Sequence, residues 1–142
     1  MDLPDVNIFV HAFRSDSADH QLCRTWLAQR LAGPEAVAIS TQVLAGFIRV
    51  VTHARVFRRP SRLDEALRFC ERLITSAACR EVQPGARHWS IFSELCRSTR
   101  ATGNEVPDAW FAALAIEAGC RWITLDRGFA RFANLQLASP EV

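Results

Sequence analysis

Short apolar runs alternate along this chain with longer stretches of helical spacing, and this alternation restricts the fold more than any other feature. The runs at 36–39 and 120–125 are short and rich in residues suited to a buried strand. Between them, apolar residues recur every three or four positions, as they do on one face of a helix. Strands that alternate with helices pair in parallel, because each helix returns the chain to the same end of the sheet. The sequence therefore predicts an α/β fold.

Capping and turn residues set the expected boundaries of the elements. A first strand is expected to end near Asp5 and to lead into a helical turn or two, because Pro4 cannot continue a sheet ladder. A further brief strand is expected at 81–82. The expected helices run from Asp16 or Asp19 to about Leu31, from Ser40 or Thr41 to about Thr52, from Ser61 to about Ile74, from about Arg87 to Ala101, and from Pro107 to Gly119. Their inward faces are expected to include Leu67 and Ile74 in the third, and Trp89 and Phe92 in the fourth.

Composition narrows the class of protein. With 142 residues and 49% hydrophobic content, residues 1–142 are expected to form a single domain with one core. No run approaches the ~18 apolar residues of a membrane span, and the N-terminus does not look like a signal peptide, so a cytoplasmic protein is expected. The five cysteines contain no C-x-x-C pair, which argues against zinc ribbons and thioredoxin-like chemistry. All 17 basic residues are arginine, which excludes enzymes that depend on a lysine, such as P-loop NTPases.

Three aspartates fall where a parallel α/β sheet binds its ligands. Asp5 and Asp126 follow strands, and Asp108 lies in the first turn of the helix before the last of these strands. Converging carboxylates repel one another unless a cation or proton intervenes, and oxygen ligands without Cys or His suit Mg²⁺ or Mn²⁺. Singly, each aspartate also has an ordinary interpretation: Asp108 favours a helix dipole, and Asp126 favours a turn.

The motifs that carry these aspartates resemble a known family. The sequence reads DVN at 5–7, VPDA at 106–109 and TLDRGF at 124–129, in the order and spacing of the PIN domain. The resemblance is closest to VapC-type toxin ribonucleases of bacterial toxin–antitoxin pairs and covers essentially the whole chain. It implies a three-layer α/β/α sandwich around a short-stranded parallel sheet. It also implies a Mg²⁺-dependent endoribonuclease that hydrolyses phosphodiester bonds in structured RNA as the toxin of a type II pair.

The resemblance also implies roles for individual residues. Asp5 and Asp108 match the two acids most regularly assigned to the metal, and Asp126 matches the later acid that completes the cluster. All three are therefore expected to be catalytic residues and metal ligands. Asn7 and Thr124 match polar groups that orient these acids. Many relatives carry a glutamate where this chain has Gly46, so the number of metal ions, one or two, stays open. Glu105 is a possible replacement for the missing acid.

Arginines near the acids or in one short stretch are candidates for contacts with RNA phosphates. The alternative for the stretch 49–62 is a solvated loop whose arginines pair with Asp64 and Glu65. Arg127 and Arg131 lie nearer the expected site. The candidates within the stretch are Arg49, Arg55, Arg58, Arg59 and Arg62, together with His53.

Relatives further imply a homodimer and an antitoxin partner whose tail covers the acidic site. The apolar residues of the helices at 19–31 and 41–52 are either partner-facing or core; they are Trp26, Leu27, Phe47, Val50 and Val51. Two functions other than a toxin ribonuclease are considered for this sequence. A catalytically weakened PIN-like module that binds RNA or a protein is the main alternative, to which Gly46 points. A phosphatase of the haloacid dehalogenase kind is disfavoured, since Asn7 replaces its second acid and no lysine is present.

Overall fold

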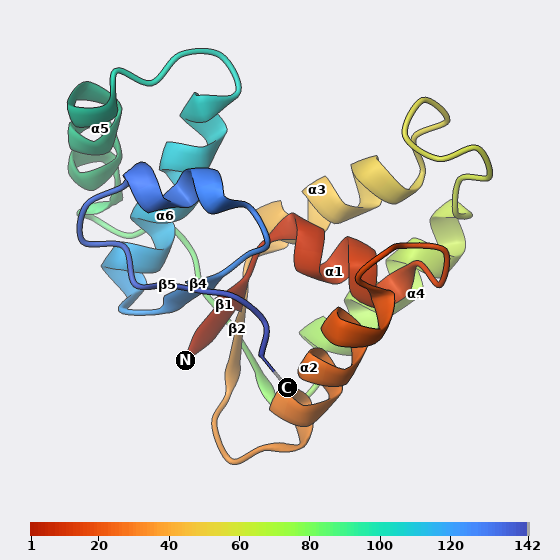
Figure 1. Ribbon diagram of the computed structural model, residues 1–142. Helices are drawn as coiled ribbons and strands as arrows, with labels where there is room; N and C mark the ends of the chain where they lie inside the picture. The colour runs from red at the N-terminus through yellow and green to blue at the C-terminus, as the bar shows by residue number, and fades with distance from the viewer. Residues whose placement is uncertain (142) are drawn as a thin grey trace.

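The computed structural model describes residues 1–141 and shows a parallel sheet between two layers of helices (Figure 1). The strands are short and follow the order β3-β2-β1-β4-β5 across the sheet, with every neighbouring pair parallel. This confirms the expected three-layer α/β/α sandwich with a short-stranded sheet. The strands are β1 (Asp2–Pro4), β2 (Val37–Ile39), β3 (Cys79–Glu81), β4 (Arg121–Ile123) and β5 (Leu137–Ala138).

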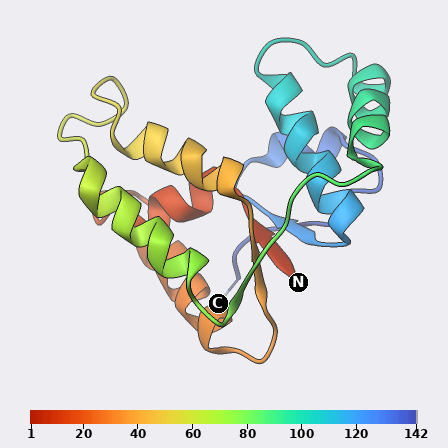
Figure 2. The same ribbon diagram turned by 180° about the vertical axis from the view of Figure 1, so that it is seen from behind.

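The helices divide between the two faces of the sheet in chain order. Those that connect β1 to β2 and β2 to β3 lie on one face, and those that connect β3 to β4 lie on the other (Figures 1 and 2). The first layer holds α1 (Val6–Phe13), α2 (His20–Ala32), α3 (Thr41–Val51) and α4 (Leu63–Ile74). The second layer holds α5 (His88–Thr99), α6 (Glu105–Ala118) and the 3₁₀ helix η1 (Arg127–Arg131).

The crossover through α5 and α6 brings the two ends of the chain together. It carries the chain back past β2 and β1, so that β4 pairs with β1 along its whole length. Pro4 lies opposite Ile123, and the amide of Asp5 donates a hydrogen bond of 2.8 Å to the Ile123 carbonyl. As expected, β1 ends at Pro4. The residues that follow β1 and β4 therefore share one edge of the sheet.

Large apolar side chains fill both layers. On the α6 side, Trp122 of β4 stacks on Phe111 with ring centroids 5.6 Å apart. The sequence left open whether five apolar residues of α2 and α3 face a partner or the core; all five belong to the core. Trp26, Leu27, Phe47 and Val51 are buried and Val50 is partly buried, so none of the five forms an exposed docking surface. Within residues 1–141, no helix has the length and apolar character to span a membrane.

The prediction that Trp89 faces inward is wrong, since 67% of its surface is exposed. Its neighbour His88 takes the inward position instead, with Nε2 lying 3.0 Å from the Trp110 carbonyl. Adjacent residues on a helix are about 100° apart, so burying His88 turns Trp89 outward. Leu67 and Ile74 are also exposed, because α4 meets the core through Ala66, Cys70 and Leu73.

Some boundaries also differ from the expected ones. The last long helix begins at Glu105, two residues before Pro107, whose missing amide hydrogen costs nothing in a first turn. The helix expected from Ser61 begins at Leu63, because the Ser61 hydroxyl accepts a hydrogen bond from Arg14 at 3.0 Å. The third strand covers 79–81 instead of 81–82.

Candidate active site

Asp5 joins β1 to α1 and is held by partners from both ends of the chain. As the N-cap of α1, its Oδ1 accepts a hydrogen bond of 2.6 Å from the Val6 amide. Its Oδ2 accepts one from the Thr124 hydroxyl at 2.6 Å and one from the Asn7 side chain at 3.0 Å. The side chain is buried, with 7% of the residue exposed. The Asp5 carboxylate is therefore fixed in one orientation.

Thr124 is the centre of this hydrogen-bond network. Besides donating to Asp5, its hydroxyl accepts hydrogen bonds of 3.0 Å from the Asn7 side chain and 3.0 Å from the Asp126 amide. The Asn7 side-chain oxygen in turn accepts from the Leu125 amide at 3.3 Å. Asn7 and Thr124, the two predicted orienting residues, thus connect the Asp5 carboxylate to the backbone that carries Asp126.

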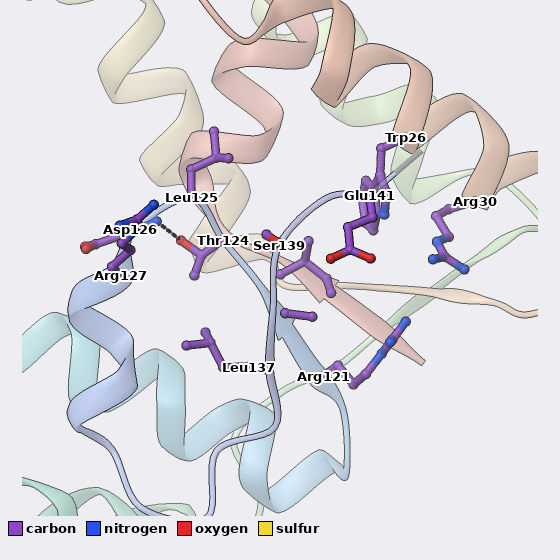
Figure 3. Close-up of a pocket in the computed structure, with 12 residues that line it drawn as sticks. Trp26, Arg30, Arg121, Thr124, Leu125, Asp126, Arg127, Leu137, Ser139 and Glu141 are labelled. Atoms are coloured by element: carbon purple, nitrogen blue, oxygen red, sulfur yellow. Dashed lines mark hydrogen bonds between the residues drawn. The ribbon is translucent and has the colours of Figure 1, made fainter.

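Asp126 caps η1 just beyond the end of β4. Its Oδ1 accepts a hydrogen bond of 2.8 Å from the Gly128 amide, and no hydrogen bond reaches its Oδ2 from residues 1–141. The residue is exposed. Figure 3 shows it beside Thr124, with the hydrogen bond between them dashed. One oxygen of Asp126 is therefore anchored and the other is available to a ligand.

Asp108 lies in the first turn of α6 and is paired with an arginine. Its Oδ2 accepts a hydrogen bond of 2.9 Å from Arg131 Nη2. The same guanidinium donates through Nη1 to the Gly128 carbonyl, and its Nε lies 3.8 Å from a carboxylate oxygen of Glu105. Arg131, a candidate for RNA contact, is instead directed at two acids, and Glu105 joins the site through it.

The three predicted aspartates influence one another electrostatically. The pKa of Asp5 is raised to about 6, chiefly because burial disfavours its charged form. Hydrogen bonds from Thr124 and Val6 lower it, whereas the negative charges of Asp108 and Asp126 raise it. Hydrogen bonds also link the three side chains: the Thr124 hydroxyl joins Asp5 to the Asp126 backbone, and Arg131 joins Asp108 to Gly128, whose amide donates to Asp126. The structure thus brings Asp5, Asp108 and Asp126 to the same edge of the sheet.

The donor set at this edge suits a hard cation. All the charged donors are carboxylate oxygens, and a cation beside Asp5 would offset both its burial and the repulsion. Within residues 1–141, no three Asp, Glu, His or Cys side chains stand ready to hold one ion together. Mg²⁺ requires no such group, because it keeps several waters and takes one or two protein carboxylates. The residues therefore fit Mg²⁺ bound largely through water.

Gly46 lies next to the acidic edge. A Cβ atom at this position would lie 3.0 Å from Cγ2 of Val6, the residue that follows Asp5. Position 46, where the resemblance implies a glutamate in many relatives, thus packs against the start of α1.

The arginine-rich stretch lies at some distance from the acids. Arg14, which follows α1, donates hydrogen bonds to the Arg59 carbonyl at 2.7 Å and to the Ser61 hydroxyl at 3.0 Å. This loop is therefore anchored at one end of α1 and Asp5 at the other, a separation of about 12 Å along the 8-residue helix. Arg62 pairs with Asp64 at 3.3 Å, as the alternative reading expected. The exposed arginines of this region are Arg49, Arg55, Arg58, Arg59 and Arg62.

Comparison with known proteins identifies the family. The model of the PIN domain matches residues 3–135, a segment that contains all three aspartates. A VapC ribonuclease of Mycobacterium bovis is 40% identical over 136 residues, which cover 96% of this chain and 92% of that protein. Ribonuclease VapC25 of Mycobacterium tuberculosis is 34% identical over the full length of both chains. This chain belongs to the VapC ribonucleases of the PIN-domain family.

Solved structures share the fold of this VapC-family chain. A VapBC2 complex from Rickettsia felis, bound to a promoter DNA fragment, superposes with a TM-score of 0.72 at 19% identity and covers 98% of both chains. VapC20 of Mycobacterium tuberculosis, a sarcin-ricin loop cleaving toxin, gives a TM-score of 0.67 at 17% identity. It covers 95% of this chain and 98% of its own. The arrangement of strands that joins Asp5 to Thr124 is therefore that of VapC folds.

Proposed function

We propose that this chain is the toxin of a type II toxin–antitoxin pair and hydrolyses phosphodiester bonds in structured RNA with Mg²⁺, or Mn²⁺ in its place. Membership of the VapC family supports the ribonuclease activity. The observation that carries the proposal is the network in which Thr124 joins Asp5 to Asp126, with the charge of Asp108 nearby. Carboxylates that converge in this way repel one another, and a bound cation relieves that repulsion.

Asp5 and Asp108 are the proposed metal ligands, and Asp126 is the third catalytic acid. A bound Mg²⁺ supplies polarisation of the scissile phosphate and acidifies the attacking water. Asp5 is held in place for this by Thr124 and Asn7. The unpaired oxygen of Asp126 is free to orient the water and accept its proton.

One metal ion is the proposed stoichiometry. Position 46 offers no carboxylate, and Glu105 is 3.8 Å from the Arg131 guanidinium, which offsets its charge. Two ions about 3.5–4 Å apart need more carboxylates than these to hold them. The proposal is thus a single-metal site, which oxygens of the RNA phosphate would help to complete.

The exposed arginines of the loop after α3 are proposed to contact RNA away from the cleaved bond. Arg55, Arg58 and Arg59 have no ion pair with any residue of 1–141, so their charges are available to phosphates. Their distance from Asp5 fits a folded substrate that extends past the acidic edge. The remaining parts of the proposal are a cytoplasmic homodimer and an antitoxin that covers the acids, the latter because the solved VapC-fold neighbours include VapBC complexes.

The proposal is tested by replacing the acids one at a time. Purified Asp5→Asn, Asp108→Asn and Asp126→Asn should each cleave total RNA at least about 100-fold more slowly than the wild type, with Mg²⁺ present. Asp64→Asn, an exposed acid of α4, serves as the matched control and should keep full activity. Mapping the new 5′ ends by sequencing identifies the RNA that is cut.

Two results would contradict the proposal. Full activity in an aspartate variant would remove that residue from the catalytic group. A wild type that neither binds Mg²⁺ in calorimetry nor cuts RNA would instead point to the binding module. The relatives of this chain are named ribonucleases, which favours the enzyme over that alternative.

A further inference from the structure

A cavity of 590 Å³ opens beside the acidic edge, on the face of the sheet that carries α2 (Figure 3). Thr124 and Asp126 belong to both the cavity and the catalytic network, so the two are continuous. Strands β4 and β5 form its floor, α2 forms one wall, and the segment 139–141 runs along it. Its size lies within the range of about 300–1,000 Å³ typical of small-molecule sites.

Two arginines meet at the end of the cavity far from Asp126. Arg121 donates hydrogen bonds of 2.8 and 3.0 Å to the two carboxylate oxygens of Asp2, and Arg30 lies 3.4 Å from the same carboxylate. Asp2 is buried, whereas the side chains of Arg30 and Arg121 are 42% and 46% exposed. Both guanidinium groups therefore face solvent at this end of the cavity, where the negative charges of Asp2 and Glu141 also act on Arg121.

The rest of the lining suits a base and a second phosphate. Ile123 and Ala138 give the floor an apolar surface between the two ends. At the near end, the exposed Arg127 stands beside Asp126 (Figure 3). Along the cavity, Asp126 and Arg127 thus come first, the apolar floor follows, and the pair of Arg30 and Arg121 lies at the far end. This order matches the alternation of phosphate and base along a nucleic-acid strand.

We propose that this cavity binds the nucleotide adjacent to the scissile phosphate of an RNA substrate, with the base on the floor of β4 and β5 and the next phosphate on Arg30 and Arg121. The inference rests on the proposed ribonuclease function and adds a subsite to it. A single-stranded or looped segment is required, because a paired base is not free to enter a cavity.

Glu141 places a negative charge in the same cavity, so its removal should change RNA affinity in the direction opposite to the removal of an arginine. Its carboxylate lines the wall near Arg121, and its negative charge acts on that guanidinium. It therefore competes with an RNA phosphate for the arginine pair. Removing the charge of Glu141 should strengthen RNA binding, whereas removing that of Arg30 should weaken it.

The test measures binding without cleavage. A short fluorescein-labelled single-stranded RNA of mixed sequence is titrated in EDTA and followed by fluorescence anisotropy. Arg30→Gln and Arg127→Gln should each weaken binding about five-fold and reduce the slope of log Kd against log salt by about 0.7, the contribution of one phosphate contact on a single strand. Glu141→Gln should tighten binding about two-fold. Asp2 keeps its two hydrogen bonds from Arg121 in the Arg30 variant, so the fold should hold, as checked by thermal melting.

Arg97→Gln is the matched control, because Arg97 lies on α5, is 75% exposed and does not line the cavity. The proposal is overturned if the cavity variants bind RNA with the affinity and salt slope of Arg97→Gln, or if Glu141→Gln and Arg30→Gln change affinity in the same direction. A cavity that takes a polypeptide instead of RNA would give the first of these results. If the wild type cuts RNA but the cavity variants bind RNA like the control, only the proposed subsite is wrong. A wild type that neither binds nor cuts RNA removes the ribonuclease function itself.

Discussion

At the scale of single residues, one hydroxyl organises the site. Thr124 makes three hydrogen bonds, and each joins a different segment: to Asp5 after β1, from Asn7 in α1, and from the amide of Asp126. Among residues 1–141, no other side chain of the network is hydrogen-bonded to both aspartates. The hydroxyl is buried, so its loss cannot be repaired by bulk water.

Thr124→Val should therefore damage both the fold and the activity. The valine keeps the shape of the side chain but leaves the Asp126 amide without its acceptor, and it removes one of the two acceptors of the Asn7 side chain and one donor to Asp5. We expect the free energy of unfolding to fall by about 2 kcal/mol, measured by urea denaturation, and RNA cleavage to fall at least about ten-fold. Thr124→Ser restores the hydroxyl and should recover most of both. Equal activity in the valine and serine variants would show that the hydroxyl does not organise the site.

At the scale of elements, helix α6 stabilises structure at both of its ends. Its first turn carries Asp108, and its last turn carries Glu117, whose carboxylate accepts hydrogen bonds from the amides of Gly85 at 2.6 Å and Arg87 at 2.9 Å. The loop between β3 and α5 is thereby fastened to the end of α6. These hydrogen bonds lower the pKa of Glu117.

Glu117→Gln should destabilise the protein by about 1 kcal/mol at pH 7, a modest value because the carboxylate is largely exposed to water. A lowered pKa means that the folded state favours the charged carboxylate. The carboxylate makes its full contribution to the free energy of unfolding at pH values above its ordinary pKa of 4.5. This contribution disappears as the pH falls through the lowered pKa of the folded state. The difference in unfolding free energy between wild type and variant should thus shrink on acidification below 4.5. Glu71→Gln on α4 is the control, and a difference that stays constant with pH would contradict the assignment.

At the scale of the whole molecule, a charged network ties the N-terminus to the last third of the chain. Asp2 of β1 is hydrogen-bonded to Arg121 of β4, 119 residues away, and pairs with Arg30 of α2. The network lies at the amino ends of the strands, opposite the acidic edge. It joins the two halves of the sheet, and it also holds the two arginines that line the cavity.

Arg121→Met should lower the free energy of unfolding by about 2 kcal/mol, because it leaves the buried Asp2 with Arg30 alone. Urea denaturation measures this loss directly. Arg80→Met, on the edge strand β3, removes an exposed arginine of similar size and should cost less than about 0.5 kcal/mol. Equal losses in the two variants would mean that the network does not stabilise the sheet.

The sequence predicted the features that depend on local pattern and chain order. The positions of Asp5 and Asp126 followed from strand ends, and strand ends follow from short apolar runs. Contacts between distant side chains left no such pattern. The pairing of Arg131 with Asp108 depends on how η1 turns back towards α6, and the exposure of Trp89 depends on a rotation of α5 about its axis. The two-residue strand β5 was too short to give any signal, and so the cavity beside it was also missed.

The position of β1 in the middle of the sheet has a consequence for synthesis of the protein. Asp2 of this strand leaves the ribosome 119 residues before Arg121, the first residue of its neighbour β4. Until that segment emerges, Asp5 lacks the threonine that holds it, and the third aspartate does not exist. A growing polypeptide that lacks β4 thus has no assembled acidic edge, and on the proposed function it would not cut the RNA around it.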